Sequence, residues 1–263
     1  MNYYAFQIIL LTLGLFAFML LLLEWGRRKG RRRLEEDGEK ASEGDGTVNR
    51  AILALMGLLL AFTFSGAATR FDVRRHLIAQ EANAIRTAYL RLDILQPSAR
   101  EPLKELFRRY LDVRLEIYHN FTDEELVNAN SSQSSALQAE LQAEIWRLAV
   151  IACRAESGQP ATTFLLPALN QMFDITTTRT VTYKIHPPII IYAMLILFTL
   201  ASALLAGFGM AGNKKRNWTH MLAFAATLSF ATYVILDLEF PRRGLIRIDQ
   251  YDQVLIAVRD SMK

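Results

Sequence analysis

The chain has 263 residues, a formal net charge of +4 and a mean hydropathy of +0.15. This length would allow one or two water-soluble domains, but the apolar residues concentrate in four blocks long enough to cross a bilayer. The single cysteine, Cys153, excludes an intrachain disulfide, and the four scattered histidines match no metal-binding spacing. The sequence also has no Walker loop, dinucleotide fingerprint or nucleophile elbow. We therefore expect an integral membrane protein that is not an enzyme and has no cofactor or metal site.

The first apolar block, residues 1–25, predicts a retained transmembrane helix. About 20 apolar residues cross a hydrocarbon layer of about 30 Å, and this block has that length. Its positive charges follow the apolar run, which is the wrong order for a cleaved secretory signal.

A basic run from Arg27 to Arg33 opens the next segment, residues 26–50. Acidic residues, serine and glycine follow it, and this composition cannot bury enough apolar surface to offset the entropy of ordering. The segment is therefore expected to be a charged, flexible linker. A basic run beside a span is typical of a topology signal or of contact with anionic headgroups, so no nucleic-acid partner is expected although the pI is about 9.2.

The second block, residues 51–69, carries small residues four apart at Gly57, Ala61 and Ser65. This spacing lets another helix approach closely. No proline or turn signal ends the block, and apolar positions continue at helical spacing as far as Leu92. The pattern predicts one long helix over about residues 50–95 that leaves the membrane as a stalk.

Residues 70–187 predict an extramembrane helical bundle. Apolar stripes at helical spacing cover residues 103–117 and 137–152, and a further helix is expected over residues 162–185. A shorter helix starting at Thr122 and a polar loop over residues 130–134 are expected between the stripes. Two prolines at 187 and 188 end the bundle, since proline blocks helix continuation.

The remaining chain predicts a third span over residues 188–211, a basic loop over 212–217, a fourth span over 218–237 and a tail over 238–263. The tail is expected to be short and either amphipathic or extended. The predicted fold is therefore all-α, with four transmembrane helices and a helical extramembrane bundle inserted between the second and third spans.

Four spans place residues 26–50 and 212–217 on one side of the membrane, and both termini with the bundle on the other. Positive charges near the spans are almost balanced between the two sides. The first span decides the orientation, because no charged side chain precedes it and six follow within seven residues. We therefore expect the termini and the bundle to be extracytoplasmic.

Three stretches of the sequence form a pattern beyond hydropathy. They are Gly57 to Phe62 leading to Arg70-Phe71-Asp72, Glu81 to Ile85 with Tyr89-Leu90-Arg91, and Leu236-Asp237 with Pro241 to Ile246. With the spacing of the spans, they resemble a bacterial family of bestrophin-like membrane proteins. The resemblance implies kinship with bestrophins, which are pentameric anion channels whose second span lines the pore. It also implies a homo-oligomer in the bacterial inner membrane, with inorganic anions such as chloride as the ions that pass.

Ionisable side chains are missing from the centres of the four predicted spans. Such groups mark proton relays and ion-coupled sites, so their absence argues against a pump and leaves a passive pore allowed. In the second span Phe62, Ser65 and Thr69 share one face and are the candidate pore-lining residues, a constriction followed by hydroxyls. The alternative is ordinary helix packing, with small residues as contacts and phenylalanines facing lipid.

Charged residues gather where the second and fourth spans end. Arg70, Arg74, Asp237 and Arg242 are the candidate pore-mouth charges, which would concentrate anions. The alternative is an ion-pair cluster that fixes the helix ends. Glu81 on the stalk has no second carboxylate, histidine or nucleophile at a fixed spacing, so no chemistry is assigned to it.

Two functions remain open at this point. The first is a homo-oligomeric passive channel that conducts anions. The second is a non-enzymatic sensor or scaffold whose helical bundle binds a partner and whose spans only anchor it in the lipid bilayer.

Overall fold

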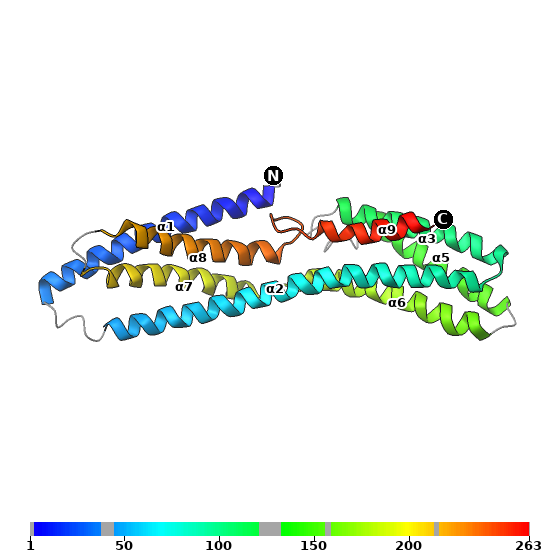
Figure 1. The fold of residues 1–263 in the computed structure, drawn as a ribbon, viewed down its shortest axis with the longest axis horizontal. Helices are drawn as coiled ribbons and strands as arrows, with labels where there is room; N and C mark the ends of the chain where they lie inside the picture. Colours follow the sequence, from blue (N-terminus) through cyan, green and yellow to red (C-terminus); the bar gives the residue numbers. More distant parts are fainter. Residues whose placement is uncertain (1–2, 38–44, 121–132, 156–158, 213–215, 263) are drawn as a thin grey trace. The chain divides into compact units, whose positions relative to one another are not determined.

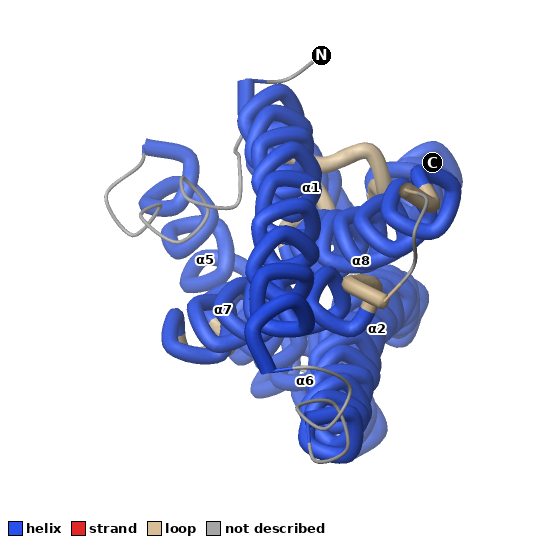
Figure 2. The backbone as a smooth tube through the Cα atoms, turned by 90° about the vertical axis from the view of Figure 1, so that its left-hand side faces the viewer, coloured by secondary structure: helices blue, strands red, loops and turns tan. Residues whose placement is uncertain are grey.

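The computed structural model describes residues 3–37, 45–120, 133–155, 159–212 and 216–262. Within these ranges the chain forms helices joined by turns and loops, without a strand (Figure 2), which confirms the all-α class. The expected helix start at Thr122 and the expected loop over residues 130–134 lie outside the described residues. The helices, labelled in Figure 1, are α1 (Tyr3–Asp37), α2 (Asp45–Arg91), η2 (Leu92–Ile94), α3 (Pro97–Asn120), α5 (Gln133–Ala155), α6 (Gln159–Lys184), α7 (Ile189–Gly209), α8 (Trp218–Glu239), η4 (Asp249–Asp252) and α9 (Gln253–Ser261).

The chain divides into two compact units, each with its own core. The membrane unit comprises residues 1–70 and 187–245, and the bundle unit comprises residues 71–186 and 246–263. Helix α2 contributes its first part to one unit and its second part to the other.

Four helices are long and apolar enough to cross a membrane, as the sequence predicts. They are α1, α2, α7 and α8, and in α7 the helix starts directly after the proline pair because Pro188 can occupy its N-cap position. Asn217 caps α8 by accepting a hydrogen bond from the backbone N–H of His220 at 3.3 Å. These caps mark where the third and fourth spans begin.

Helix α1 continues through the basic run to Asp37, so the prediction of a flexible linker over residues 26–50 was wrong for residues 26–37 and 45–50. Arginine, lysine, leucine and glutamate all favour helix, and Arg28 pairs with Glu24 one turn earlier at 2.8 Å. Composition alone suggested disorder, because composition does not include these local contacts or the packing of α1 against α7.

The close packing of α1 on α7 depends on glycine. A Cβ at Gly26 would collide with the carbonyl oxygen of Leu204, and one at Gly207 would collide with the carbonyl oxygen of Leu23. In the sequence, Gly26 and Gly30 have the four-residue spacing that lets membrane helices approach closely. The sequence analysis placed the small-residue contact on α2 at Gly57, where a Cβ would meet nothing within 4 Å in this chain.

Helices α1, α7 and α8 pack against one another and enclose the core of the membrane unit (Figure 1). Met19 and Leu23 from α1, Ala203 from α7, and Met221 and Ala225 from α8 are buried there. At one end of this group Arg216 pairs with Glu24 at 2.5 Å, so the start of α8 lies beside the second half of α1. At the other end, the rings of Tyr4 and Phe240 meet edge to face with centroids 5.2 Å apart.

The bundle unit is built on α3, α5, α6 and the second part of α2, with α9 packed against α3. Its core contains the apolar stripes that the sequence predicted, among them Ile78, Ile85, Leu103, Phe107, Leu111, Ile145, Leu165 and Leu169. The tail supplies Leu255 and Val258 from α9, so its amphipathic reading is the one that the structure supports.

Candidate functional site

The part of α2 in the membrane unit has two distinct faces. Met56 and Ala67 are buried against the rest of the unit. A helix turns about 100° per residue, so Phe62, Ser65 and Thr69 fall on roughly the opposite side. All three are exposed in the single chain, and Phe62 is 67% exposed. The structure therefore places the candidate pore-lining residues together on an uncovered face of α2, opposite its buried residues.

The two hydroxyls on this face differ in their hydrogen bonding. Thr69 donates from Oγ1 to the carbonyl oxygen of Ser65 at 2.8 Å, so its proton is used inside the helix. Ser65 is also exposed, and it follows Phe62 by about one helical turn. A serine hydroxyl that is not committed elsewhere can donate to an anion.

Arg70 ends this part of α2 and is paired with α8. Its Nε donates to Glu239 Oε1 at 3.1 Å and its Nη2 donates to Glu239 Oε2 at 2.7 Å, and Glu239 is fully buried. The arrangement is a fork of two hydrogen bonds, the strongest form of an arginine–carboxylate contact. It fixes the end of α2 to the end of α8.

Asp237 and Arg242 lie near this pair but point into the protein. Asp237 is fully buried and accepts a hydrogen bond from the backbone N–H of Leu245 at 3.0 Å. A Cβ at Gly244 would collide with the Asp237 carboxylate, so glycine is required for this approach. Arg242 is also buried. Both of these candidate pore-mouth charges are therefore buried in the single chain, and Asp237 holds the turn after α8 through its hydrogen bond with Leu245.

Arg74 belongs to the bundle unit. Its guanidinium donates to the carbonyl oxygen of Ile185 at 3.2 Å and lies 5.9 Å from the centroid of the Tyr183 ring. With 1% of its surface exposed, Arg74 ties α2 to the end of α6. Of the four candidate pore-mouth charges, Arg70 has the most accessible side chain.

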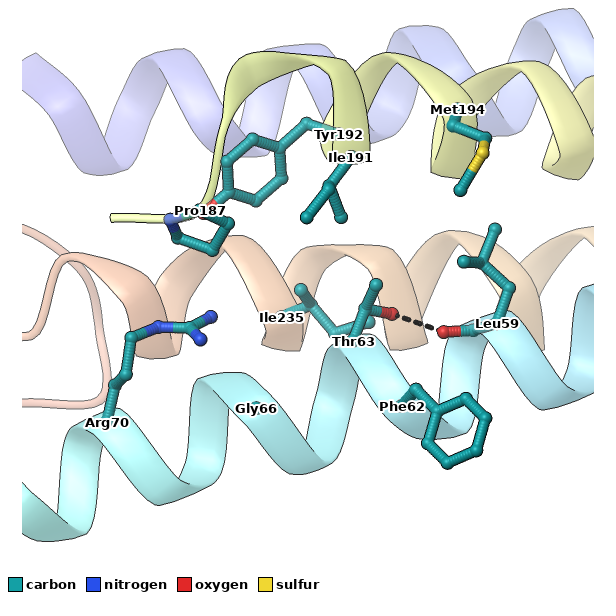
Figure 3. A pocket seen from close by; sticks show the side chains of 10 residues that line it. All are labelled: Leu59, Phe62, Thr63, Gly66, Arg70, Pro187, Ile191, Tyr192, Met194 and Ile235. Atoms are coloured by element: carbon teal, nitrogen blue, oxygen red, sulfur yellow. Dashed lines mark hydrogen bonds between the residues drawn. The ribbon is translucent and has the colours of Figure 1, made fainter. Parts of the chain in front are cut away.

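A crevice of about 250 Å³ lies between α2, α7 and α8 in the membrane unit (Figure 3). Figure 3 shows the side chains of Thr63, Ile191 and Met194 at the crevice and the guanidinium of Arg70 at one end. Thr63 donates to the carbonyl oxygens of Leu59 and Leu60 at 2.9 and 3.0 Å, so its methyl group is left to face the crevice. Apart from Arg70, Thr63 and the hydroxyl group of Tyr192, the lining side chains are apolar.

The bundle unit contains a buried charge network that the sequence analysis did not identify. Glu81 accepts hydrogen bonds from Arg114 Nε and Nη2 at 2.8 and 2.7 Å and from the Tyr118 hydroxyl at 2.9 Å, and it also pairs with Arg179. Arg179 in turn pairs with Asp252 at 3.2 Å. Burial raises the pKa of Glu81, but the Arg114 and Arg179 guanidinium groups outweigh it and hold that pKa below its usual range.

A signal for this network was present in the sequence. Glu81 falls on the apolar stripe of α2 between Ile78 and Ile85, where a lone carboxylate predicts a buried charge that needs a partner. The partners could not be identified, because Arg114 and Arg179 are 33 and 98 residues away in the chain. Among the described residues, no group of three or more His, Cys, Asp or Glu side chains could hold a metal ion.

The comparisons with known proteins agree with this architecture. A family model for a bestrophin-like domain matches residues 11–251. Two crystal structures of a bacterial bestrophin homologue from Klebsiella pneumoniae, each with a different single mutation, are similar to most of the chain. One has a TM-score of 0.66 at 13% identity and covers 95% of this chain and 98% of that chain. The other has a TM-score of 0.68 at 12% identity and covers 94% and 97%. The comparison with curated proteins gives no match.

Proposed function

Since the chain belongs to the bestrophin-like family, we propose that it forms a homo-oligomeric passive ion channel that conducts inorganic anions such as chloride. The observation that carries the proposal is the uncovered face of α2. Only 11% of the apolar stretch of α2 is buried within the chain, against 44% for α8. In an oligomer, this face of each subunit is turned toward the others around a common axis.

The proposed conduction path is uncharged along the span. The α2 face presents Phe62 and then the hydroxyls of Ser65 and Thr69, without an ionisable group between residues 51 and 69. Phe62 forms the apolar constriction, and a ring of such side chains gates a pore by excluding water. Ser65 supplies a hydrogen-bond donor that stabilises a partly dehydrated anion below it. The flow is passive, because the spans hold no proton relay.

Chloride flux in liposomes tests this proposal. The purified protein should pass chloride down a gradient, and Phe62→Ala should raise the flux by removing the constriction. The matched control is Phe64→Ala, because Phe64 is also exposed on α2 but lies about 200° around the helix. Liposomes that leak no more than empty ones, or equal effects of the two substitutions, would contradict the proposal.

We further propose that the termini and the bundle are extracytoplasmic, in a bacterial inner membrane. The support is the distribution of charge around the first span. The basic residues of α1 follow this span and lie at the same end of the unit as Arg216, and a basic flank of the first span favours the cytoplasmic side. Cys153 is buried and is a poor accessibility probe.

Single cysteines introduced into a Cys153→Ala chain test the orientation. Ala143 is exposed on α5 and Thr47 is exposed at the start of α2. A membrane-impermeant maleimide added to whole cells with a permeabilised outer membrane should label Ala143→Cys and not Thr47→Cys. The reverse pattern would place the bundle in the cytoplasm.

A further inference from the structure

We propose that the crevice between α2 and α7 binds one acyl chain of a membrane phospholipid, with the lipid phosphate held by Arg70. This goes beyond the proposed function, because it concerns lipid bound beside α2 and not ions conducted along it. The chemistry needed is an apolar slot in the bilayer with a cation at the depth of the headgroups.

The slot is built from apolar surface on the flank of α2. Leu59 and Thr63 from α2 point toward Ile191 and Met194 from α7, and the ring of Phe62 is turned away from α7 (Figure 3). In a bilayer such a space is filled by hydrocarbon, because neither water nor a polar group is stabilised there. The volume of about 250 Å³ accommodates a segment of one acyl chain, and the crevice is open on one side, so the rest of the chain can continue along the protein surface.

The cation is positioned by Gly66 and Glu239. Glu239 accepts hydrogen bonds from Nε and Nη2 of Arg70, and these bonds fix the plane of the guanidinium group. The third nitrogen, Nη1, lies on the Gly66 side, where a Cβ at residue 66 would stand 3.2 Å from it. Glycine therefore leaves the approach to Nη1 open from the crevice, and Nη1 has donors suited to a phosphate oxygen.

The depth of Arg70 also fits a headgroup. Arg70 follows the last apolar residues of the second span, and Pro187, which precedes the third span, lines the same end of the crevice. The apolar part of the crevice continues from there toward Leu59 and Met194, along the spans. A phospholipid with its phosphate at Arg70 would thus extend one chain in the direction in which lipid chains lie.

The test uses phosphatidylglycerol that carries a photoactivatable diazirine on one acyl chain, in liposomes containing the purified protein. Irradiation should label peptides that contain Leu59 or Met194. Gly66→Leu should abolish this labelling by filling the slot. The control is Gly57→Leu, the same change on the same helix at a position with open space around it, which should leave the labelling unchanged. Ile191→Trp fills the slot from α7 and replaces Gly66→Leu if that variant does not assemble.

The phosphate contact has its own test. Arg70→Gln combined with Glu239→Gln removes the cation together with the carboxylate that pairs with it. It should weaken labelling by phosphatidylglycerol by roughly tenfold, which is the order of one lost hydrogen bond to a charged group. Labelling by a diacylglycerol probe, which has no phosphate, should not change. Three results would overturn the proposal: equal labelling of Gly66→Leu and the parent, labelling spread evenly over the spans, or crosslinks from the slot to a second copy of the chain. Each of these results is independent of whether the protein conducts chloride.

Discussion

The carboxylate of Glu81 accepts two hydrogen bonds from the guanidinium of Arg114, at 2.8 and 2.7 Å, and both side chains are buried. A buried pair of this kind is strongly destabilised when one partner is removed, because the other charge is left without compensation. The pair therefore gives the bundle unit a measurable weak point.

Replacing the carboxylate tests this contribution. Glu81→Gln would leave Arg114 buried without its anion, while Arg179 keeps Asp252, and should cost about 3–5 kcal/mol in the free energy of unfolding. Thermal unfolding in detergent measures the loss. Glu144→Gln is the control, because Glu144 pairs with Arg147 in contact with solvent and its loss should leave the melting temperature unchanged. A stable Glu81→Gln protein would show that the network does not hold the bundle together.

The same carboxylate predicts a dependence on pH. The ordinary pKa of glutamate is about 4.3 in the unfolded chain. Although burial raises it, the arginines hold the folded pKa of Glu81 lower. The ionised carboxylate thus stabilises the fold above about pH 4.3 and loses this effect as the pH falls through the folded pKa. Unfolding followed from pH 7 downward should show a steeper loss for the parent chain than for Glu81→Gln, and parallel curves would contradict this.

The turn after α8 depends on Asp237 and Gly244. Gly244→Ala would place a methyl group against the Asp237 carboxylate, and Asp237→Ala would leave the Leu245 N–H without its acceptor. Each should lower the free energy of unfolding by about 1–3 kcal/mol. Gly212→Ala, at an exposed position with open space, should change it little. The melting temperatures of the three variants test this prediction. Equal melting temperatures would show that the turn contributes nothing to stability.

The contact between α1 and α7 predicts a third effect on stability. Gly26→Leu or Gly207→Leu would force the two backbones apart and should cost about 1–3 kcal/mol or more through overpacking. Gly14→Leu, on the same helix α1 in open space, is the control and should be tolerated. The fraction of monodisperse protein in detergent after heating measures the difference. If Gly14→Leu lost as much monodisperse protein as the test variants, the result would contradict a specific role for the contact between α1 and α7.

The four spans and the helical class were predictable from sequence, because apolar runs of the right length and helical spacing are local properties. The continuation of α2 through Arg70 was predicted for the same reason. The extension of α1 to Asp37 was missed, because its basic composition argues for disorder while Gly26 packs against a helix about 180 residues further on. Such a contact cannot be read from a local window.

The candidate site was predictable only in part. Phe62, Ser65 and Thr69 follow from helical periodicity, so their common face could be expected before it was observed. The roles of Arg74 and Asp237 could not, because Arg74 is tied to Ile185 and Asp237 to a backbone N–H eight residues later. Charge and position in the sequence suggested a pore mouth, whereas their burial depends on tertiary contacts.

The most direct measurement asks whether the open face of α2 lines the conduction path. Ser65→Cys and Thr69→Cys are made in a Cys153→Ala chain, with Phe64→Cys as the control on the other side of the helix. A charged, water-soluble thiol reagent should block chloride flux through the first two and leave the control unaffected, because only their thiols face the proposed pore. Unchanged flux in all three, or equal block of all three, would contradict a pore lined by this face.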